Sequence, residues 1–472
     1  MLLKNNCVSK IKMTVAFCFS FFMVMDITSC NSGGNGHPEP AKGKHFIKEL
    51  NASEIPLGQQ TTAIIAATII DGNGGPAVSN GCVIVKNGRI TEVGINGKVN
   101  IPAGAEIIDG HGMALLPGLI DAHFHLDGMA GLPALFLQHG VTSVRDPGAW
   151  IDYYSAERAS GKPEPRLFLS GPHLDMFPPA YPKDAYIVRD AEEAVRQVNR
   201  MADEGASMIK VYFRLPPAII REICKAAHQR GIPVTGHLEI TEAVEAIEAG
   251  LDGIEHITSF SISLQPKIEG EKYRQAVLAD NNARKHGRYE VWKKIDVNGT
   301  LADSLIHYLA HKGTFVTPTL GPFEYQLPRN VNNSETGYSY ALQPLNEFDK
   351  MPADSIKLAG FRNMQAMTAR MRKGGVRIVL GSHSSIPYAE TGWAYQREME
   401  LLVESGLTPG ETIVASTMEN ARNFRIDDRL GSIEKGKIAE IGSHDELMQK
   451  RGTFYRLVQA QQAMNEVLVV GG

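Results

Sequence analysis

The chain has 472 residues, a formal net charge of -4 and 21% charged residues. This length provides for one large domain and a smaller satellite domain, and the charge gives no electrostatic case for binding nucleic acid. The five cysteines contain no Cys-x-x-Cys pair and three of them precede residue 31, so a framework of disulfide bonds is not expected.

Residues 1–30 have the pattern of a bacterial export signal. A basic region with three lysines precedes an apolar run, residues 13–25, that is too short to span a bilayer comfortably. The run is followed by Ile27-Thr28-Ser29-Cys30, which resembles a lipobox, the motif whose cysteine is lipidated after cleavage. We therefore predict a bacterial cell-envelope protein that is held at a membrane through lipidated Cys30. The alternative is a plain secretory signal that releases the chain into the periplasm.

Two segments separate this leader from the main domain. Residues 31–60 are rich in glycine, proline and polar residues and are expected to form a flexible tether. Residues 61–115 are expected to form a β-rich satellite domain, in which strands at 82–85 and 89–93 flank Lys86-Asn87-Gly88. An Asn-Gly pair between two strands predicts a tight hairpin turn, because both residues tolerate a positive φ angle.

Residues 116–425 alternate between short apolar, strand-like runs and helical segments. This alternation indicates βα units and a parallel sheet, and a (β/α)8 barrel places its chemistry at the carboxyl ends of such strands. Helical patterns are expected at residues 216–229, 241–249, 396–404 and 408–418, and further helices over the active-site mouth within 258–312. A polar segment at 325–351 is expected to form a lid or surface excursion. Eight strands are expected near residues 116–125, 142–145, 166–170, 208–212, 233–237, 252–256, 314–318 and 377–382.

Metal-compatible side chains end several of these strands. His123 and His125 follow an apolar run, and because strand side chains alternate, both imidazoles are expected on the same face. Lys210, His237 and His256 end three later strands. Neutral imidazoles are common ligands of zinc and similar cations. Lys210 could instead pair with a carboxylate, and each histidine could be a hydrogen-bonded core residue, but four such strand ends in this order favour a metal site.

From residue 61 to residue 437 the chain resembles the amidohydrolase superfamily, nearest its imidazolonepropionase-like and prolidase-like members. The resemblance rests on Pro-Gly-Leu-Ile-Asp-Ala-His-Phe-His at 117–125, Ile-Lys-Val at 209–211, Gly-His at 236–237 and Glu-His at 255–256. It implies an α/β fold: a (β/α)8 TIM-type barrel with a small β-sandwich satellite domain. It also implies one or two divalent metal ions, most commonly zinc. His123 and His125 would bind one ion, His237 and His256 the other, and a carbamylated Lys210 would bridge them.

One position departs from the family pattern. The eighth strand of the family ends in an aspartate that contacts metal and accepts a proton from water, whereas this chain has His383 at that position. A neutral imidazole can accept a proton or ligate metal. Three interpretations remain: His383 is the catalytic base, a nearby acid such as Glu390 replaces it, or the site binds without turnover. We favour the first.

The C-terminal segment, residues 426–472, also departs from the family. Residues 430–437 match the family's return toward its sandwich domain, but the stretches 438–447 and 455–459 resemble the end of an ABC-exporter nucleotide-binding domain. No GxxxxGK[ST] loop is present, so ATP hydrolysis is not expected. We predict an atypical amphipathic helical tail and a sandwich that is incomplete on its C-terminal side. A recombined or misassembled gene end is the alternative.

The combined pattern predicts a metal-dependent hydrolase. It would cleave a C–N bond of a small amide, cyclic amide or dipeptide-like substrate with metal-activated water. Tyr212 and Arg214, just beyond Lys210, are candidates to orient the substrate. Two alternatives remain: a lipid-anchored, non-catalytic binding protein with a vestigial metal site, and a deaminase, against which Lys210 argues.

Overall fold

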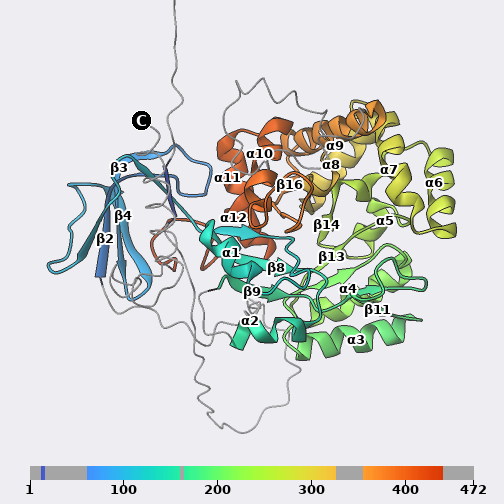
Figure 1. Ribbon diagram of the computed structural model, residues 1–472, viewed down its shortest axis with the longest axis horizontal. Helices are drawn as coiled ribbons and strands as arrows, with labels where there is room; N and C mark the ends of the chain where they lie inside the picture. Colours follow the sequence, from blue (N-terminus) through green and yellow to red (C-terminus); the bar gives the residue numbers. More distant parts are fainter. Residues whose placement is uncertain (1–11, 16–60, 160–163, 326–353, 439–472) are drawn as a thin grey trace, which may run out of the picture.

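The computed structural model describes residues 12–15, 61–159, 164–325 and 354–438. The predicted tether, most of the predicted lid and the tail beyond residue 438 lie outside these residues, as does Cys30. Figure 1 shows two parts, a β-rich domain at the left and a larger α/β domain at the right. Among the described residues, no helix is both long and apolar enough to cross a membrane.

The smaller part is a mixed sheet whose strand order is β1-β6-β2-β3-β4, with β5 paired to β2. At the predicted hairpin, Asn87 has φ 51 and Gly88 has φ 68, and β3 pairs antiparallel with β4 across this turn. The predicted Asn-Gly turn is therefore present. Lys12–Val15, within the predicted leader, forms a short strand parallel to β6. The six strands are β1 (Lys12–Val15), β2 (Thr61–Ile69), β3 (Val78–Lys86), β4 (Arg89–Ile95), β5 (Glu106–Asp109) and β6 (Met113–Leu116).

The larger part contains eight parallel strands in the positions that the sequence predicts for the barrel. One sheet has the order β7-β8-β9, and the other runs through β12-β13-β14-β15-β16. Backbone hydrogen bonds join the sheets at both edges: Ala122 N donates to Leu380 O at 2.9 Å, and Ser207 N donates to Leu169 O at 2.8 Å. The eight strands are β7 (Leu119–Asp121), β8 (Val141–Asp146), β9 (Arg166–Leu169), β12 (Ile209–Val211), β13 (Val234–Gly236), β14 (Gly253–Glu255), β15 (Phe315–Thr317) and β16 (Arg377–Ile378).

Helices follow most barrel strands and form its outer layer (Figure 1). The connection from β14 to β15 contains helices, as predicted, namely the three α-helices α6 to α8. An unpredicted pair of short strands, β10 (His173–Asp175) and β11 (Ala185–Ile187), follows β9. The helices are α1 (Leu132–Gln138), α2 (Ser155–Ala159), α3 (Ala191–Asp203), α4 (Pro217–Gln229), α5 (Ala243–Glu248), α6 (Lys267–Ala279), α7 (Ala283–Lys294), α8 (Thr300–Lys312), α9 (Ser355–Lys373), α10 (Ala394–Ser405), α11 (Pro409–Ser416) and α12 (Met418–Asn423), with single 3-10 turns η2 (Ile151–Tyr154), η3 (Ile257–Phe260) and η4 (Gly321–Phe323).

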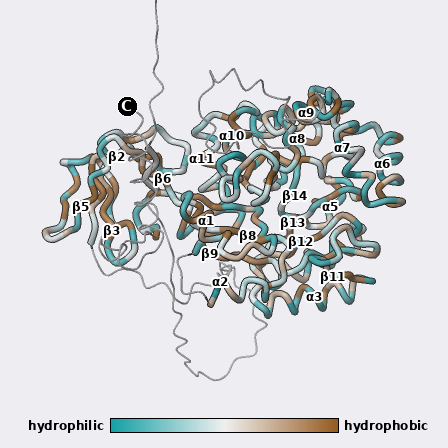
Figure 2. Tube along the Cα trace, viewed as in Figure 1, coloured by the Kyte–Doolittle hydropathy of each residue, from teal (hydrophilic) through white to brown (hydrophobic). Residues whose placement is uncertain are grey.

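Burial of the strands explains why they read as continuous apolar runs. Every residue of β7, β8, β9, β12, β13 and β14 is buried, as expected for parallel strands covered on both faces. A second apolar cluster joins the satellite sheet to Phe424 and Ile438, and Ile438 pairs antiparallel with Arg89 of β4. Hydrophobic residues accordingly follow the strands of both parts in Figure 2. The chain thus returns to its satellite sheet, and the barrel strands direct their carboxyl ends to one shared face.

Candidate metal centre

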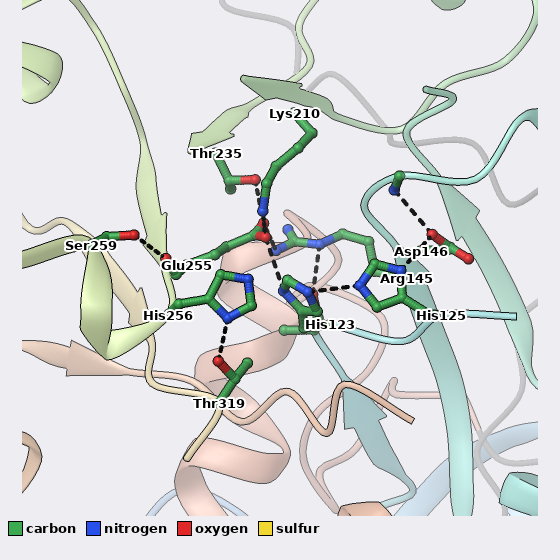
Figure 3. A network of polar contacts seen from close by, with 12 residues as sticks. His123, His125, Arg145, Asp146, Lys210, Thr235, Glu255, His256, Ser259 and Thr319 are labelled. Atoms are coloured by element: carbon green, nitrogen blue, oxygen red, sulfur yellow. Dashed lines mark hydrogen bonds and ion pairs between the residues drawn. The ribbon is translucent and has the colours of Figure 1, made fainter. Parts of the chain in front are cut away.

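The carboxyl ends of the barrel strands bring the predicted ligands together. The ring centroids of His123 and His125 lie 4.9 Å apart, those of His123 and His256 4.6 Å, and those of His237 and His256 4.4 Å. Lys210 approaches the same point from β12, and Figure 3 shows its side chain directed toward Glu255 beside the histidines. Side chains that are distant in sequence therefore converge on one buried point, although His237 belongs to neither of the compact ligand groups described next.

The ring nitrogens are arranged as metal ligands would be. Nε2 of His123 lies 3.0 Å from Nε2 of His125, a separation that two ligands of one ion can have when each binds zinc at about 2.0–2.1 Å. One group of nitrogens within 4.8 Å of one another comes from His123, His125 and His383, and a second group combines His123 with Glu255 and His256. Several acceptor atoms that face one another are better satisfied by a shared cation than by contacts among themselves.

The other ring nitrogens support the same interpretation. The His256 Nδ1 lies 2.5 Å from the hydroxyl of Thr319, which leaves Nε2 available as a ligand. Among the described residues, Nδ1 of His237 and Nδ1 of His383 are buried without a hydrogen-bond partner. Burial lowers the pKa of His237 to about 4 and holds that of His256 well below its usual value, so both rings favour the neutral form that binds metal. The residues present therefore fit divalent cations.

Lys210 is enclosed in the same cluster. The residue is 2% exposed, and its Nζ lies in close contact with Oε2 of Glu255. Burial is the main cause, and the charge of Arg145 the second, that hold the pKa of Lys210 well below its usual value. This shift favours the neutral amine. The carboxylate contact is the one that the alternative interpretation of Lys210 expected. The bridging role of Lys210 stays a prediction.

Glu255 is the residue of this centre whose role the sequence did not indicate. It is fully buried, lies 2.9 Å from Nδ1 of His123 and accepts a hydrogen bond from the Thr235 hydroxyl at 2.5 Å. Nη2 of Arg145 lies 3.7 Å from Oε1 of Glu255, the oxygen that accepts the Thr235 hydrogen bond. His123 Nδ1 and Glu255 Oε2 are close enough for an ion pair but form no hydrogen bond with each other, so Glu255 is a charged neighbour of His123. The only sequence feature that could have suggested a role for Glu255 is its position immediately before His256. Strand alternation argued against that role, because neighbouring side chains on a strand point to opposite faces.

A second carboxylate stands behind His125. Nδ1 of His125 lies 3.6 Å from Asp146, whose other oxygen accepts a 2.7 Å hydrogen bond from the Tyr154 hydroxyl. A third, Asp121, ties the first barrel strand to the eighth: it accepts bonds from the backbone N of His123 at 3.0 Å and of Ser382 at 2.9 Å. Burial raises the pKa of Asp121 to about 6. Asp146 thus lies beside the ring of His125, and Asp121 fixes the backbone that carries His123.

His383 lies beside the first pair of histidines. Its ring is 4.7 Å from that of His125, and its backbone N donates to His123 O at 2.7 Å. It has a positive φ of 63, a conformation that is costly for a non-glycine residue and that turns its ring toward the cluster. Burial is the main cause that lowers the pKa of His383 well below its usual value, and the electrostatic effect of His125 is the second. The alternative base, Glu390, has an exposed side chain and is not part of the cavity wall.

The cluster forms the floor of a cavity of about 950 Å³. Tyr212 lines this cavity, with its ring 4.8 Å from that of His237, as a substrate-orienting residue would. Arg214 does not: its guanidinium donates to Asn281 and to the carbonyl oxygens of Val277 and Leu278. A direct role of Arg214 in orienting substrate is therefore not supported by its position.

Comparison with known proteins agrees with this geometry. Residues 114–450 match the amidohydrolase family. The chain belongs to the amidohydrolase family. Together with the histidine cluster, membership makes this amidohydrolase a metal-dependent hydrolase of carbon–nitrogen bonds.

Solved structures share the fold of this amidohydrolase. A putative prolidase from Bifidobacterium longum is 23% identical, with 84% of this chain and 92% of that chain covered and a TM-score of 0.57. A Xaa-Pro dipeptidase with bound methionine in the active site is 20% identical, with 83% and 96% covered and a TM-score of 0.56. Molinate hydrolase is 19% identical, with 81% and 89% covered and a TM-score of 0.56. At these identities the likeness establishes the barrel fold and the satellite domain.

A curated protein of another kind also matches. ABC transporter B family member 4 of Dictyostelium discoideum is 29% identical over 154 residues. The match covers 31% of this amidohydrolase and spans 20% of the length of the transporter. The matched protein is an ABC transporter, the same class of protein that the C-terminal stretches of the sequence resemble.

Proposed function

We propose that this amidohydrolase cleaves the C–N bond of a small amide, cyclic amide or dipeptide-like substrate at a centre of two divalent cations, with zinc as the expected metal. The observation that carries the proposal is the convergence of four histidines on buried Lys210 at the floor of one cavity. His123 and His125 would hold one cation and His237 and His256 the other.

Lys210 would join the two cations after carbamylation. The neutral Nζ adds to the carbon of CO2, a new N–C bond forms and one proton leaves, so the nitrogen becomes part of an anionic carbamate. The buried environment of Lys210 favours the neutral amine that this reaction requires. Glu255, now in contact with Nζ, would then be released to accept the Nδ1–H of His123.

The cations, when bound, would lower the pKa of water and polarise the substrate carbonyl. His383 would accept the proton of the attacking water, because its ring lies beside His125 and favours the neutral form. The same proton then passes to the substrate nitrogen as the C–N bond breaks. Tyr212 would contact the substrate next to His237.

The test combines metal content with turnover. The purified protein is assayed for bound metal and against a panel of N-acyl amino acids, dipeptides, lactams and esters, before and after treatment with a chelator. We expect hydrolysis of at least one C–N substrate, its loss on chelation and its recovery on addition of zinc. Bound metal without hydrolysis of any member would favour the non-catalytic binding protein instead.

A matched variant separates the site from the rest of the fold. His139 is a part-buried histidine whose Nδ1 contacts the Gly392 carbonyl at 2.8 Å, and it does not line the cavity. Replacing His139 with Ala should leave bound metal unchanged, whereas His237→Ala should reduce it.

A further inference from the structure

A buried arginine lies beside the metal centre. Arg145 of β8 is 2% exposed, and Figure 3 shows its guanidinium directed toward Glu255. Its Nε donates to the carbonyl oxygen of Ala122 at 3.1 Å, and its guanidinium carbon lies 4.9 Å from the centre of the Phe424 ring. Ala122 directly precedes His123 in the chain. Arg145 is therefore held between the strand end that carries His123 and the strand end that carries Glu255.

The charge of Arg145 is buried at an energetic cost. Both terminal nitrogens, Nη1 and Nη2, are buried without a hydrogen-bond partner among the described residues. Nη2 lies 3.7 Å from Oε1 of Glu255, which is an ion-pair distance but too long for a good hydrogen bond. A buried ion pair can often be replaced by apolar side chains of similar volume without loss of stability. Packing alone therefore does not account for an arginine at this position.

Glu255, the carboxylate that Arg145 faces, also contacts two of the predicted ligands. Its Oε2 lies 2.9 Å from Nδ1 of His123 and in close contact with Nζ of Lys210. Its Oε1 accepts the hydrogen bond of the Thr235 hydroxyl and is the oxygen that faces Arg145. One oxygen of Glu255 is thus directed toward the ligands and the other toward the groups that hold the carboxylate in place.

The proposed metal centre leaves Arg145 as the cation beside this carboxylate. A histidine binds metal as the neutral imidazole, and the carbamate proposed for Lys210 is anionic. Of the three basic side chains that pair with Glu255 in the described part of the chain, Arg145 would then be the one with a positive charge. A buried carboxylate without a cationic partner is unfavourable, so the position of Glu255 would depend on Arg145.

We propose that Arg145 is a positioning residue of the metal centre, which holds Glu255 in place with Oε2 toward His123 and Lys210. Arg145 is not part of the cavity wall, so it would act on the ligands through Glu255 and would not contact the substrate. The proposal rests on the proposed metal centre and adds a residue on which the arrangement of its ligands depends.

Metal affinity tests this role independently of turnover. The affinity for zinc is measured by competition with a chromophoric chelator, for the wild-type chain and for Arg145→Met. This change keeps an unbranched side chain and removes the charge. We expect Arg145→Met to bind zinc about 10–100-fold more weakly, which is the usual effect of removing a group that orients metal ligands from outside the coordination shell.

Arg397 provides the matched control. It is also a buried arginine, 1% exposed, and its Nη2 lies 2.7 Å from Oε1 of Glu324, but it does not line the cavity. Arg397→Met removes the same group from another buried pair and should leave the affinity for zinc unchanged, even where it lowers stability. Thermal unfolding identifies a temperature at which all variants are folded. If Arg145→Met does not fold, Arg145→Gln takes its place.

Combination with Glu255→Gln shows whether Arg145 acts through Glu255. Two changes that remove the same interaction are not additive. The double variant, Arg145→Met with Glu255→Gln, should therefore bind zinc about as weakly as the weaker-binding single variant. A loss equal to the product of the two single losses would show that Arg145 acts independently of Glu255, and it would overturn the proposal.

The outcomes separate this proposal from the proposed hydrolysis. Wild-type affinity for zinc in the Arg145 variant, or an equal loss in Arg397→Met, would overturn the positioning role. Zinc binding that depends on Arg145, without hydrolysis of any member of the substrate panel, would support the positioning role and overturn the proposed hydrolysis alone. A wild-type chain that binds no zinc would overturn both.

Discussion

We expect Lys210 to decide whether the proposed centre holds one cation or two. In the structure its Nζ contacts Glu255, and as a carbamate it would reach between two cations. Replacing Lys210 with Ala is expected to remove roughly half of the bound metal, because a bridging ligand is needed by both ions but the histidines can still hold one. Metal per chain, measured by inductively coupled plasma mass spectrometry, gives the result. Full occupancy in the variant would show that Lys210 does not bridge.

Glu255 is expected to act through His123. It lies 2.9 Å from Nδ1 of His123, and loss of its charge weakens the orientation and basicity of that ligand. Glu255→Gln should lower metal affinity by about 10–100-fold, the usual effect of removing such an outer partner. Competition with a chromophoric chelator measures the affinity. An unchanged affinity would limit Glu255 to its contacts with Arg145 and Thr235.

His383 is expected to be the catalytic base. His383→Ala should lower turnover by about 10²–10⁴ while metal is retained, if the ring accepts the proton without ligating. Only the neutral ring can accept a proton, and burial with His125 lowers its pKa, so wild-type activity should fall only as the pH drops below the ordinary histidine range. The pH profile of kcat/KM measures this.

Two further variants sharpen the test of His383. His383→Asp restores the side chain that the family pattern has at this strand end and should retain measurable activity. Wild-type turnover by His383→Ala would place proton transfer on another group. Glu390 is then a weak candidate, because its exposed side chain lies outside the cavity wall.

At the scale of elements, buried charges fix α10 to Glu324, the residue that follows η4. Arg397 of α10 is 1% exposed and donates to Glu324 at 2.7 Å. Arg397→Met should lower the free energy of unfolding by about 3–5 kcal/mol, because it leaves the carboxylate of Glu324 buried without this partner. Urea denaturation measures the change. Adding Glu324→Gln to the variant should recover part of the loss, and no recovery would point to packing instead of charge.

The eight barrel strands could be predicted because each is a short apolar run between helical segments, and the hairpin turn because Asn87 and Gly88 both favour positive φ. The short strands β10 and β11 could not. They contain three residues each, and their pairing depends on neighbours that are distant in sequence.

In the candidate site, too, some residues could be predicted from the sequence and others could not. The histidines could be predicted as candidate ligands because several strand ends carry them in the order that the family resemblance expects. The partners Glu255, Asp146 and Asp121, and the place of Arg145 beside Glu255, follow from the angles at which strands and helices meet. The order of apolar and polar residues along the chain does not predict these packing angles, so these contacts could not be predicted from the sequence.

At the scale of the whole molecule, the return of the chain to its first domain was predictable and is present. Ile438 pairs with Arg89, and the backbone N of Ile90 donates to Lys437 O at 2.8 Å. The predicted helical tail lies outside the described residues and stays a prediction. The boundaries of the satellite domain and barrel, predicted at residues 61–115 and 116–425, likewise stay predictions, although the strands β2 and β7 begin at Thr61 and Leu119.

Localisation of the whole chain is expected to depend on Cys30. A lipid thioether requires the cysteine sulfur, and one acyl chain binds a membrane only marginally whereas several chains anchor a protein stably. The full-length chain should therefore sediment with membranes of a bacterial host and be extracted by detergent but not by salt. Cys30→Ser should appear in the soluble envelope fraction or stay uncleaved, and Cys18→Ser, a change within the same leader, should behave as wild type. Identical processing and fractionation of all three forms would leave an ordinary secretory signal as the interpretation of residues 1–30.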